Sequence, residues 1–360
     1  MNYPYPFFDE YAKLESLVIE GLVTKRKHPD FDLYIYNYSP KAQFLPRSQW
    51  SETLSRARGL VLDESGRQVA RSFDKFWNYD ESFVPPSGEA CYVSPKIDGS
   101  LILVLQYEGK LIFATRGSFV SDQAKEAEKI YQEKYGFWPN LGETLVFEVI
   151  YPENRIVVDY GDMRDLHLLS AFDGDYEYRP DVLRLYVQED DELKVNPTYF
   201  KNDFSKYIES AKIIKGERDE GWVLRCWPSN LRVKIKGEDY FRLHRLIFNT
   251  SQKTIWEMLK SGQSVEELAA SCGHSQFATW IKETALTLQA SHANLNSLVL
   301  SVWWHRPVGV SRKDFAAWAK QQSPSITPFM FALLDGKDIS DMLWDFVHPK
   351  FPHQYKLEGE

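Results

Sequence analysis

The pattern of apolar residues changes once along this chain, near Arg242, and this change limits the fold more than any other feature. Before it, short apolar or alternating segments typical of β-strands are separated by turns and a few helical runs. After it, the segments have helical spacing. The strand order gives no repeating βα units, which excludes a barrel of such units. We therefore expect an α+β fold, with antiparallel sheets and helices over residues 1–245 and an all-α domain over residues 246–360.

Individual elements follow from the same patterns. Helices are predicted over the first 25 residues and over residues 121–135 and 203–211, and residues 172–219 are expected to be an elaboration that joins core strands. The tail from Pro349 is predicted to be disordered or packed along an edge. Strands are predicted over residues 31–38, 60–63, 69–73, 89–94, 101–107, 110–115, 144–151, 155–158, 166–171, 220–225 and 231–236. Helices of the second domain are predicted over residues 250–261, 264–272, 277–296, 298–304, 311–320, 328–334 and 339–346.

One turn stands out for its chemistry, residues 94–101 with the sequence SPKIDGSL. Lys96 lies where a strand breaks at Asp98-Gly99, a position from which its side chain can point into a cleft. A lysine amine becomes a nucleophile when its pKa, ordinarily about 10.4, is depressed. Gly99 has no Cβ, so a nucleotide could lie directly against the turn. The alternative is a solvated lysine beside a hairpin turn.

Two acidic residues stand at strand positions that call for a partner. Glu148 lies inside the predicted buried strand, where a carboxylate is costly unless it meets a partner, a ligand or a metal. A structural salt bridge is the alternative. Glu220, followed by Gly221, lies at the mouth of a later strand. Both acids are therefore candidate site residues.

Two basic segments complete the candidate site. Lys234 and Lys236 alternate with apolar residues, so their ammonium groups point to one face of a strand, where an anion would relieve their repulsion. The alternative is an exposed strand face. Lys75, beside Phe76 and Trp77, fits base stacking or phosphate contact, and it fits the edge of a core equally well.

Composition excludes several classes. A net charge of -8 argues against a protein that coats nucleic acid through overall basicity, although it permits a local basic cleft. No apolar run reaches the length of a membrane span, and the N-terminus lacks the pattern of a signal peptide. P-loop, G-x-S-x-G and H-E-x-x-H patterns are absent. The three widely spaced cysteines, Cys91, Cys226 and Cys272, are expected to be reduced, buried thiols of a cytosolic protein.

Taken in order, four segments resemble the covalent nucleotidyltransferase superfamily of ligases and mRNA-capping enzymes. In that superfamily a lysine nucleophile is followed by an acidic strand, a Glu-Gly strand and a Lys-x-Lys strand. The corresponding segments here are residues 96–100 (KIDGS), 147–149 (FEV), 220–223 (EGWV) and 233–236 (VKIK). The resemblance implies an ATP-grasp-like ligase fold for the first domain.

Within that superfamily the sequence is most similar to the phage RNA ligase 1 type, the tRNA-repair ligases. Arg58-Gly59 and residues 75–78 (KFWN) lie upstream of the lysine, where that family has R-G and K-F-F-N. Residues 147–157 resemble its extended third block, and residues 312–319 and 341–345 resemble its helical C-terminal domain. Departures are small and concern Trp77, Trp222, Arg116 in place of a common lysine, and the unmatched residues 172–219.

The resemblance implies a three-step reaction. Lys96 attacks the α-phosphate of ATP and forms lysyl-AMP, AMP moves to an RNA 5′-phosphate, and a 3′-hydroxyl then displaces AMP. Lys234 and Lys236 would neutralise the α-phosphate and help to depress the pKa of Lys96. Mg²⁺ or Mn²⁺ would be held through water by Glu220 and Glu148. The other residues implied in nucleotide binding are Tyr36, Arg58, Lys75, Trp77, Gly99, Arg116 and Gly221.

The expected partners are RNA ends, including those of nicked tRNA, and the chain is expected to be a cytoplasmic monomer. We expect the helical domain to select the RNA, with His305-Arg306 and Arg312-Lys313 near Trp303-Trp304 as candidate contacts or ordinary surface charges. A DNA ligase or capping enzyme would need a β-rich OB-fold after Lys236, where this sequence is helical. A non-catalytic RNA-binding relative would have lost Lys96, Glu220 or Lys234, and all three are present.

Overall fold

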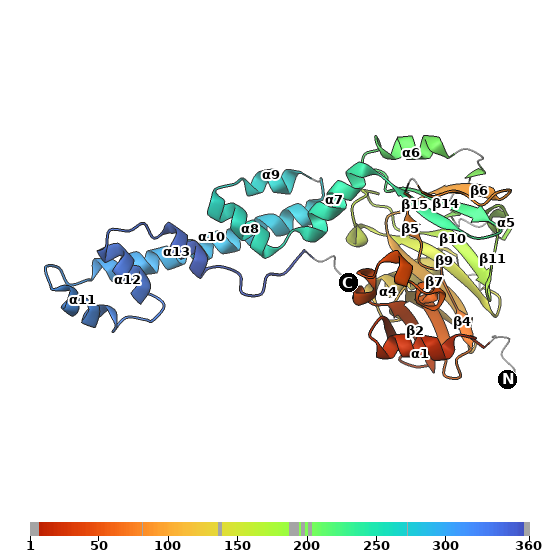
Figure 1. Cartoon of the computed structure of the whole chain (residues 1–360), viewed down its shortest axis with the longest axis horizontal. Coiled ribbons are helices and arrows are strands. Elements are labelled where there is room, and N and C mark those ends of the chain that lie inside the picture. The colour runs from red at the N-terminus through yellow and green to blue at the C-terminus, as the bar shows by residue number, and fades with distance from the viewer. Residues whose placement is uncertain are drawn as a thin grey trace. The chain divides into compact units, whose positions relative to one another are not determined.

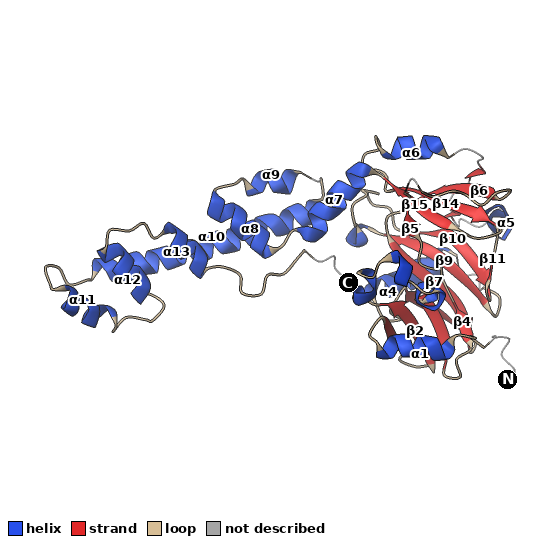
Figure 2. Ribbon diagram, in the orientation of Figure 1, coloured by secondary structure: helices blue, strands red, loops and turns tan. Residues whose placement is uncertain are grey.

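The computed structural model describes residues 7–80, 82–135, 139–186, 194–195, 199–200, 204–271 and 273–355. The chain divides into two compact units, one with the described residues up to Arg242 and one from Leu243 onward. Strands occur in the first unit, and the elements of the second are helices (Figures 1 and 2). This is the predicted α+β fold, with a helical region after a unit of mainly antiparallel sheets.

Within the described residues, the strands of the first unit form three sheets. The four-stranded sheet has the order β1-β2-β3-β4. The six-stranded sheet has the order β11-β10-β9-β7-β8, with β12 parallel to β10, and the five-stranded sheet has the order β13-β6-β14-β15-β5. Their bounds are β1 Val23–Lys27, β2 Leu33–Tyr38, β3 Arg58–Asp63, β4 Gln68–Ala70, β5 Trp77–Asn78, β6 Ala90–Pro95, β7 Ser100–Tyr107, β8 Lys110–Thr115, β9 Glu143–Ile150, β10 Asp165–Asp173, β11 Tyr176–Glu177, β12 Lys194–Val195, β13 Tyr199–Phe200, β14 Gly221–Trp227 and β15 Arg232–Lys236.

Helices cover the outer faces of these sheets because each buries an apolar stripe. Helix α4 is capped by Ser121 and packs Ala127, Ile130 and Tyr131 against the six-stranded sheet, together with Phe147 of β9. Every residue of β9 is buried, so Glu148 lies in a fully buried strand as predicted. The helices of the first unit are α1 Tyr11–Ile19, α2 Pro40–Gln43, η1 Arg47–Gln49, α3 Glu52–Arg56, α4 Asp122–Lys134, η2 Pro152–Asn154, α5 Pro180–Tyr186, α6 Ser205–Ala211 and the first part of α7 Glu238–Asn249.

Most predicted elements are confirmed, including the hairpin of β7 and β8 and the helix near residues 203–211. Two predictions in the first unit are wrong. The predicted helix of residues 1–25 ends at Ile19, because Gly21 adopts a positive φ and Val23 begins an edge strand paired with β2. Residues 155–158 form no strand, because the backbone amides of Val157 and Val158 bond to a side chain instead of a neighbouring strand. Residues 187–193, 196–198 and 201–203 of the 172–219 segment lie outside the described residues.

The second unit is organised around one long helix, α10 (Figure 1). The two helices predicted over residues 277–296 and 298–304 are one helix, because Leu295 and Val299 lie four residues apart and continue the same buried face. Tyr355 of the tail is buried against Phe277, so the tail packs along an edge. The helices of this unit are α8 Gln252–Ser261, α9 Val265–Ala270, α10 Ser275–Trp304, α11 Arg312–Ala319, α12 Thr327–Leu334 and α13 Ser340–Phe346.

Among the described residues, no helix combines the length and the apolar character that crossing a membrane requires.

Candidate active site

A cleft of about 900 Å³ opens in the first unit, lined by residues from all three of its sheets. One wall is the face of β6, β14 and β15, and the other is formed by β2, β3, β7, β8 and β9. Of the predicted site residues, the cleft is lined by Arg58, Lys96, Gly99, Arg116, Glu148 and Lys234. These six residues, spread over a sequence span of 176 positions from Arg58 to Lys234, thus meet in one cavity.

Lys96 follows the last residue of β6, where the chain turns into the cleft. Its backbone amide donates to the carbonyl of Gly221 at 2.8 Å, which extends the β6–β14 pairing by one bond. Its Nζ donates to Oε2 of Glu220 at 2.7 Å, and Oε1 of the same carboxylate lies 2.7 Å from Nζ of Lys236. Glu220 is only 2% exposed, so one buried carboxylate holds two lysines.

The pKa of Lys96 does not follow the sequence prediction. Burial lowers it, but the carboxylates of Glu220 and Glu148 outweigh burial, and the net pKa lies above the ordinary value. The expected depression by Lys234 and Lys236 is therefore outweighed in this arrangement by the two acids. The pKa of Glu220 is lowered, since Lys96 and Lys236 outweigh its burial.

Lys234 is the cation whose pKa is depressed. Burial, followed by the charges of Arg58 and Lys96, lowers its pKa to about 6. Its Nζ lies 4.7 Å from the centre of the Phe76 ring, and Arg58 lies over the same ring at 5.8 Å. Near neutral pH this wall of the cleft therefore holds a neutral Lys234 amine among fixed cations. An anion bound there would raise the pKa of the amine and favour its protonation.

The turn after Lys96 is fixed by a buried carboxylate, Asp98. Its Oδ2 accepts the backbone N–H groups of Val157 at 2.9 Å and Val158 at 2.8 Å, and its Oδ1 accepts the hydroxyl of Tyr240 at 2.7 Å. Burial and the charge of Glu220 raise its pKa above the ordinary range. From the sequence, Asp98 was predicted only as part of a turn. An acid that becomes buried requires hydrogen-bond donors, and this requirement is the signal that could have pointed to its role.

Two glycines are required by close contacts. A Cβ on Gly99 would collide with the carbonyl of Val149, and the Gly99 amide donates to Oε1 of Glu148 at 3.2 Å. Gly221 has a φ of +136° and faces the carbonyl of Ile235 across the β14–β15 pair. Gly99 lines the cleft and Gly221 does not, so Gly221 serves the strand pair that carries the lysines.

Aromatic rings surround Lys75. Its Nζ lies 5.1 Å from the ring centres of Tyr38 and Trp77 and 5.4 Å from that of Trp50. Tyr38 lines the cleft and its hydroxyl accepts a hydrogen bond from Arg116 at 3.0 Å, whereas Lys75 and Trp77 are not among the lining residues. Tyr38 was not predicted as a site residue, although it belongs to the same aromatic strand as Tyr36.

Tyr36 does not line the cleft. It is fully buried and its hydroxyl donates to Oε1 of Glu15 at 2.6 Å, in the core between the sheet and α1. The pairing of β2 with β3 skips Gly59 of β3 between Tyr36 and Asn37. Alternation alone could not have revealed this irregularity.

The acids of the site suit a metal held through water better than a direct cage. Within the described part of the chain, no group of three or more His, Cys, Asp or Glu side chains is arranged to hold a metal ion. Both oxygens of Glu220 are engaged by lysines, and burial together with neighbouring acids raises the pKa of Glu148 to about 7 despite Lys96. Mg²⁺ commonly keeps several waters and binds one or two carboxylates with substrate phosphates, which fits Glu148 and Glu220.

Two proteins of related sequence match part of the chain. A protein of Autographa californica nuclear polyhedrosis virus, inferred to be a bifunctional polynucleotide kinase/RNA ligase, is 26% identical over 264 residues, covering 64% of this chain and 36% of that protein. A protein of Thermovibrio ammonificans inferred to be an RNA ligase is 27% identical over 206 residues, covering 52% of each. The chain thus spans no more than 52% of the length of either relative.

Among solved structures, an archaeal ATP-dependent RNA ligase is similar with a TM-score of 0.47 at 15% identity, covering 78% of this chain and 79% of that one. A likeness of this size carries no argument by itself. The family model described as RNA ligase, of the phage RNA ligase 1 type, matches residues 56–245, which is more than half of the chain and contains the lysine turn and the Lys-x-Lys strand. On that match, the chain belongs to the RNA ligase family of the phage RNA ligase 1 type.

Proposed function

We propose that this protein is an ATP-dependent RNA ligase that joins a 5′-phosphate to a 3′-hydroxyl through lysyl-AMP and RNA-adenylate. The observation that carries the proposal is the position of Lys96, which lies in a cleft of the family-matched region against Glu220 and shares that cleft with Lys234 and Arg58. A nucleophilic amine beside cations and a buried carboxylate is suited to attack on a phosphate anhydride.

In the first step, the Lys96 ammonium releases one proton to solvent, and the resulting amine attacks the α-phosphorus of ATP and loses a second proton as the new bond forms. A nitrogen–phosphorus bond forms, the bond from the α-phosphorus to the bridging oxygen breaks, and pyrophosphate leaves. Glu220 aims the amine, since its Oε2 fixes Nζ at 2.7 Å. Lys234 gains a proton as the phosphate approaches, and with Arg58 it stabilises the charge on the departing pyrophosphate.

The next two steps use the same phosphate contacts. An RNA 5′-phosphate oxygen attacks the phosphorus of lysyl-AMP, which frees Lys96 and gives a 5′–5′ pyrophosphate linkage. A 3′-hydroxyl then attacks the RNA phosphorus, and AMP leaves. A divalent cation, Mg²⁺ or Mn²⁺, held through water by Glu148 and Glu220, would neutralise phosphate charge. For the nucleotide, the cleft offers Gly99, Arg116 and Glu148. Tyr38 lines the cleft and takes the role expected of Tyr36, which lies outside it.

Labelling tests the proposal directly. Incubation with α-labelled ATP followed by protease digestion should place AMP on the peptide that contains Lys96, and the labelled protein should then seal RNA with a 5′-phosphate. Label from GTP but not ATP would instead indicate a capping-type enzyme. RNA binding without any label would indicate a non-catalytic relative.

A further inference from the structure

A second pair of cations lies on the same wall of the cleft as Lys234. Arg225 of β14 and Arg232 of β15 are direct partners in the antiparallel register, and both line the cleft. Like charges directly opposite each other destabilise a strand pair. Arg232 precedes Lys234 by two residues, so the two side chains share a face and lie roughly 7 Å apart along the strand.

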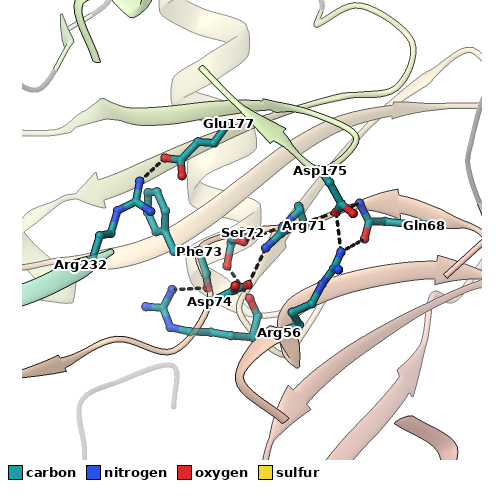
Figure 3. A network of polar contacts seen from close by, with 10 residues as sticks. Arg56, Gln68, Arg71, Ser72, Phe73, Asp74, Asp175, Glu177 and Arg232 are labelled. Atoms are coloured by element: carbon teal, nitrogen blue, oxygen red, sulfur yellow. Dashed lines mark hydrogen bonds and ion pairs between the residues drawn. The ribbon is translucent and has the colours of Figure 1, made fainter. Parts of the chain in front are cut away.

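One carboxylate serves both arginines. Glu177 of β11 is 2% exposed, its Oε1 lies 3.2 Å from Nη1 of Arg225, and it also accepts a hydrogen bond from Nη2 of Arg232 (Figure 3). Their side chains are 6% and 10% exposed. Two buried cations on one acid leave excess positive charge. Burial and the charge of Arg232 accordingly lower the pKa of Arg225 to about 10.

The two arginines differ in how far their donors are used. Arg225 donates through Nε and Nη2 to Oδ1 of Asn230 at 3.0 and 2.7 Å, and through Nη1 to the carbonyl of Tyr178 at 3.0 Å. Arg232 lies flat over Phe73, 4.6 Å from the ring centre, and its Nη2 bonds to Glu177. Among the described residues, its Nε and Nη1 have no hydrogen-bond acceptor, so these donors remain for a molecule in the cleft.

Phe73 connects this pair to the other cations of the cleft. Arg58 approaches the backbone carbonyl of Phe73 with Nη1, at 3.5 Å, while Arg232 covers its ring. The cations of the wall therefore continue from Lys96 and Lys234 past Arg58 to Arg232. A planar guanidinium keeps its charge and offers donors on more than one edge, so it matches the oxygens of a phosphate group better than a lysine does.

We propose that Arg232, held in place by Glu177 and Arg225, is a second phosphate subsite of this cleft. The proposal rests on the proposed function only in that the cleft takes a nucleotide and RNA. The same chemistry has two sources, the terminal diphosphate of the nucleotide or a backbone phosphate of the RNA strand. Either would satisfy the donors of Arg232 and balance the excess charge of the three buried side chains.

The test is a set of calorimetric titrations with two probes, inorganic pyrophosphate and a short RNA with a 5′-hydroxyl. The variants are Arg232→Gln and a matched control, Arg56→Gln. Arg56 is also a largely buried, ion-paired arginine, bonded to Asp175 and, at 2.9 Å, to Gln68, but it does not line the cleft (Figure 3). Melting curves of each variant show whether it is folded.

Arg232→Gln should weaken the binding of one probe at least tenfold, while Arg56→Gln should leave both affinities within twofold of the unmodified protein. Loss of pyrophosphate binding identifies the nucleotide as the source, and loss of RNA binding identifies the RNA backbone. Should Arg232→Gln not fold, Arg232→Lys keeps the charge without the planar guanidinium donors. It should still weaken the binding of one probe several-fold.

Unchanged affinity for both probes in the folded variants would overturn the subsite. The subsite would also be overturned if Arg232→Gln lost affinity for both probes equally and if Arg56→Gln showed the same losses together with the same fall in melting temperature. A purely structural arginine predicts that result. These titrations involve no catalysis. If the unmodified protein takes up no AMP from ATP, the ligase proposal fails while the titrations still decide whether Arg232 binds phosphate.

Discussion

Glu220 holds the nucleophile and its neighbour Lys236 at the same time. Its two oxygens hold the ammonium groups of Lys96 and Lys236 at equal distances of 2.7 Å. Removing one partner of such a buried arrangement leaves an uncompensated charge, which costs more than the arrangement itself contributes. Activity measurements on variants of Glu220, Lys96 or Lys236 therefore need a control that shows the variant is folded.

Lys96→Ala should abolish uptake of AMP from ATP and the sealing of RNA that carries a 5′-phosphate. It should retain part of the activity on RNA supplied already adenylylated, because the third step does not use the lysine nucleophile. Labelling with α-labelled ATP and gel analysis of both RNA substrates measure this. Normal AMP labelling of the variant would disprove the assigned nucleophile.

Lys234 should take up a proton when ATP binds. With a pKa of about 6 it is neutral at pH 8, and a phosphate group beside it favours the charged form and raises that pKa. Calorimetry at pH 8 in buffers of different ionisation enthalpy reports the number of protons taken up. Lys234→Met should lower that number towards zero and weaken ATP binding by at least tenfold, and an equal number in both proteins would contradict the assignment.

Glu148→Gln should make the protein more stable and less active. The folded-state pKa of about 7 lies above the ordinary value of 4.5, so the folded protein binds more protons and the cost of ionising Glu148 grows between pH 4.5 and 7. At pH 8 that cost reaches about 3 kcal/mol as an upper limit. The melting temperature should therefore rise by several degrees at pH 8 and change little at pH 5. An equal shift at both values would contradict the raised pKa.

At the scale of elements, the strand pair β14–β15 carries most of the chemistry, and Gly221 begins it. Gly221→Ala should lower the melting temperature and abolish AMP uptake, because a Cβ at this φ meets the carbonyl of Ile235. Gly109→Ala is the matched control, since Gly109 also has a positive φ, +73°, in the β7–β8 hairpin but faces open space. The control should lose only about 1 kcal/mol of stability and keep AMP uptake.

The strands of the site could be predicted because their apolar and basic residues alternate, as in residues 231–236, and because Asp98-Gly99 and Glu108-Gly109 mark turns. The boundary of β1 could not, since its sequence VTKRK has few apolar residues and depends on pairing with β2. The sequence pattern predicted two helices on either side of Ser297, whereas the structure has the single helix α10. Ser297 has an ordinary helix propensity, and tertiary packing keeps the helix continuous there.

Within the site, residues with an obvious chemical role could be predicted and those defined by contact could not. Lys96, Glu148 and Lys234 carry charge in strand-like contexts, and the structure brings them into one cleft. Tyr38, the last residue of β2, lines the cleft and Tyr36 does not, a difference that the alternation of the strand could not reveal. Arg232 acquires its position from Glu177, which is 55 residues away in sequence.

At the scale of the whole molecule, the cleft belongs to one compact unit and the helices after α7 belong to the other. Of the candidate RNA contacts in the helical unit, Arg306 lies 4.0 Å from the ring centre of Trp303, and Arg312 is paired with Asp335 at 2.6 Å. Both remain accessible enough to exchange these partners for phosphates, and Arg312 is the more exposed.

Truncation near Asn249 should leave a protein that takes up AMP, because every residue lining the cleft lies before that point. It should seal structured RNA such as a nicked tRNA anticodon loop poorly, because a chain of net charge -8 gathers RNA through local contacts and not through its overall field. AMP uptake is compared with the sealing of a broken tRNA and of a linear strand. Loss of both activities would make the helical unit structural, and equal sealing of both substrates would mean that it does not select RNA.

The bond between Lys96 and Glu220 joins residues 124 positions apart, so it forms late during synthesis on the ribosome. At a synthesis rate of roughly 5–20 residues per second, the lysine waits about 6 to 25 seconds for its carboxylate partner. During that interval β6 has no neighbour on the side that β14 later occupies. The nascent chain therefore presents an unpaired strand edge, and chaperones that shield such edges would increase the yield of folded protein.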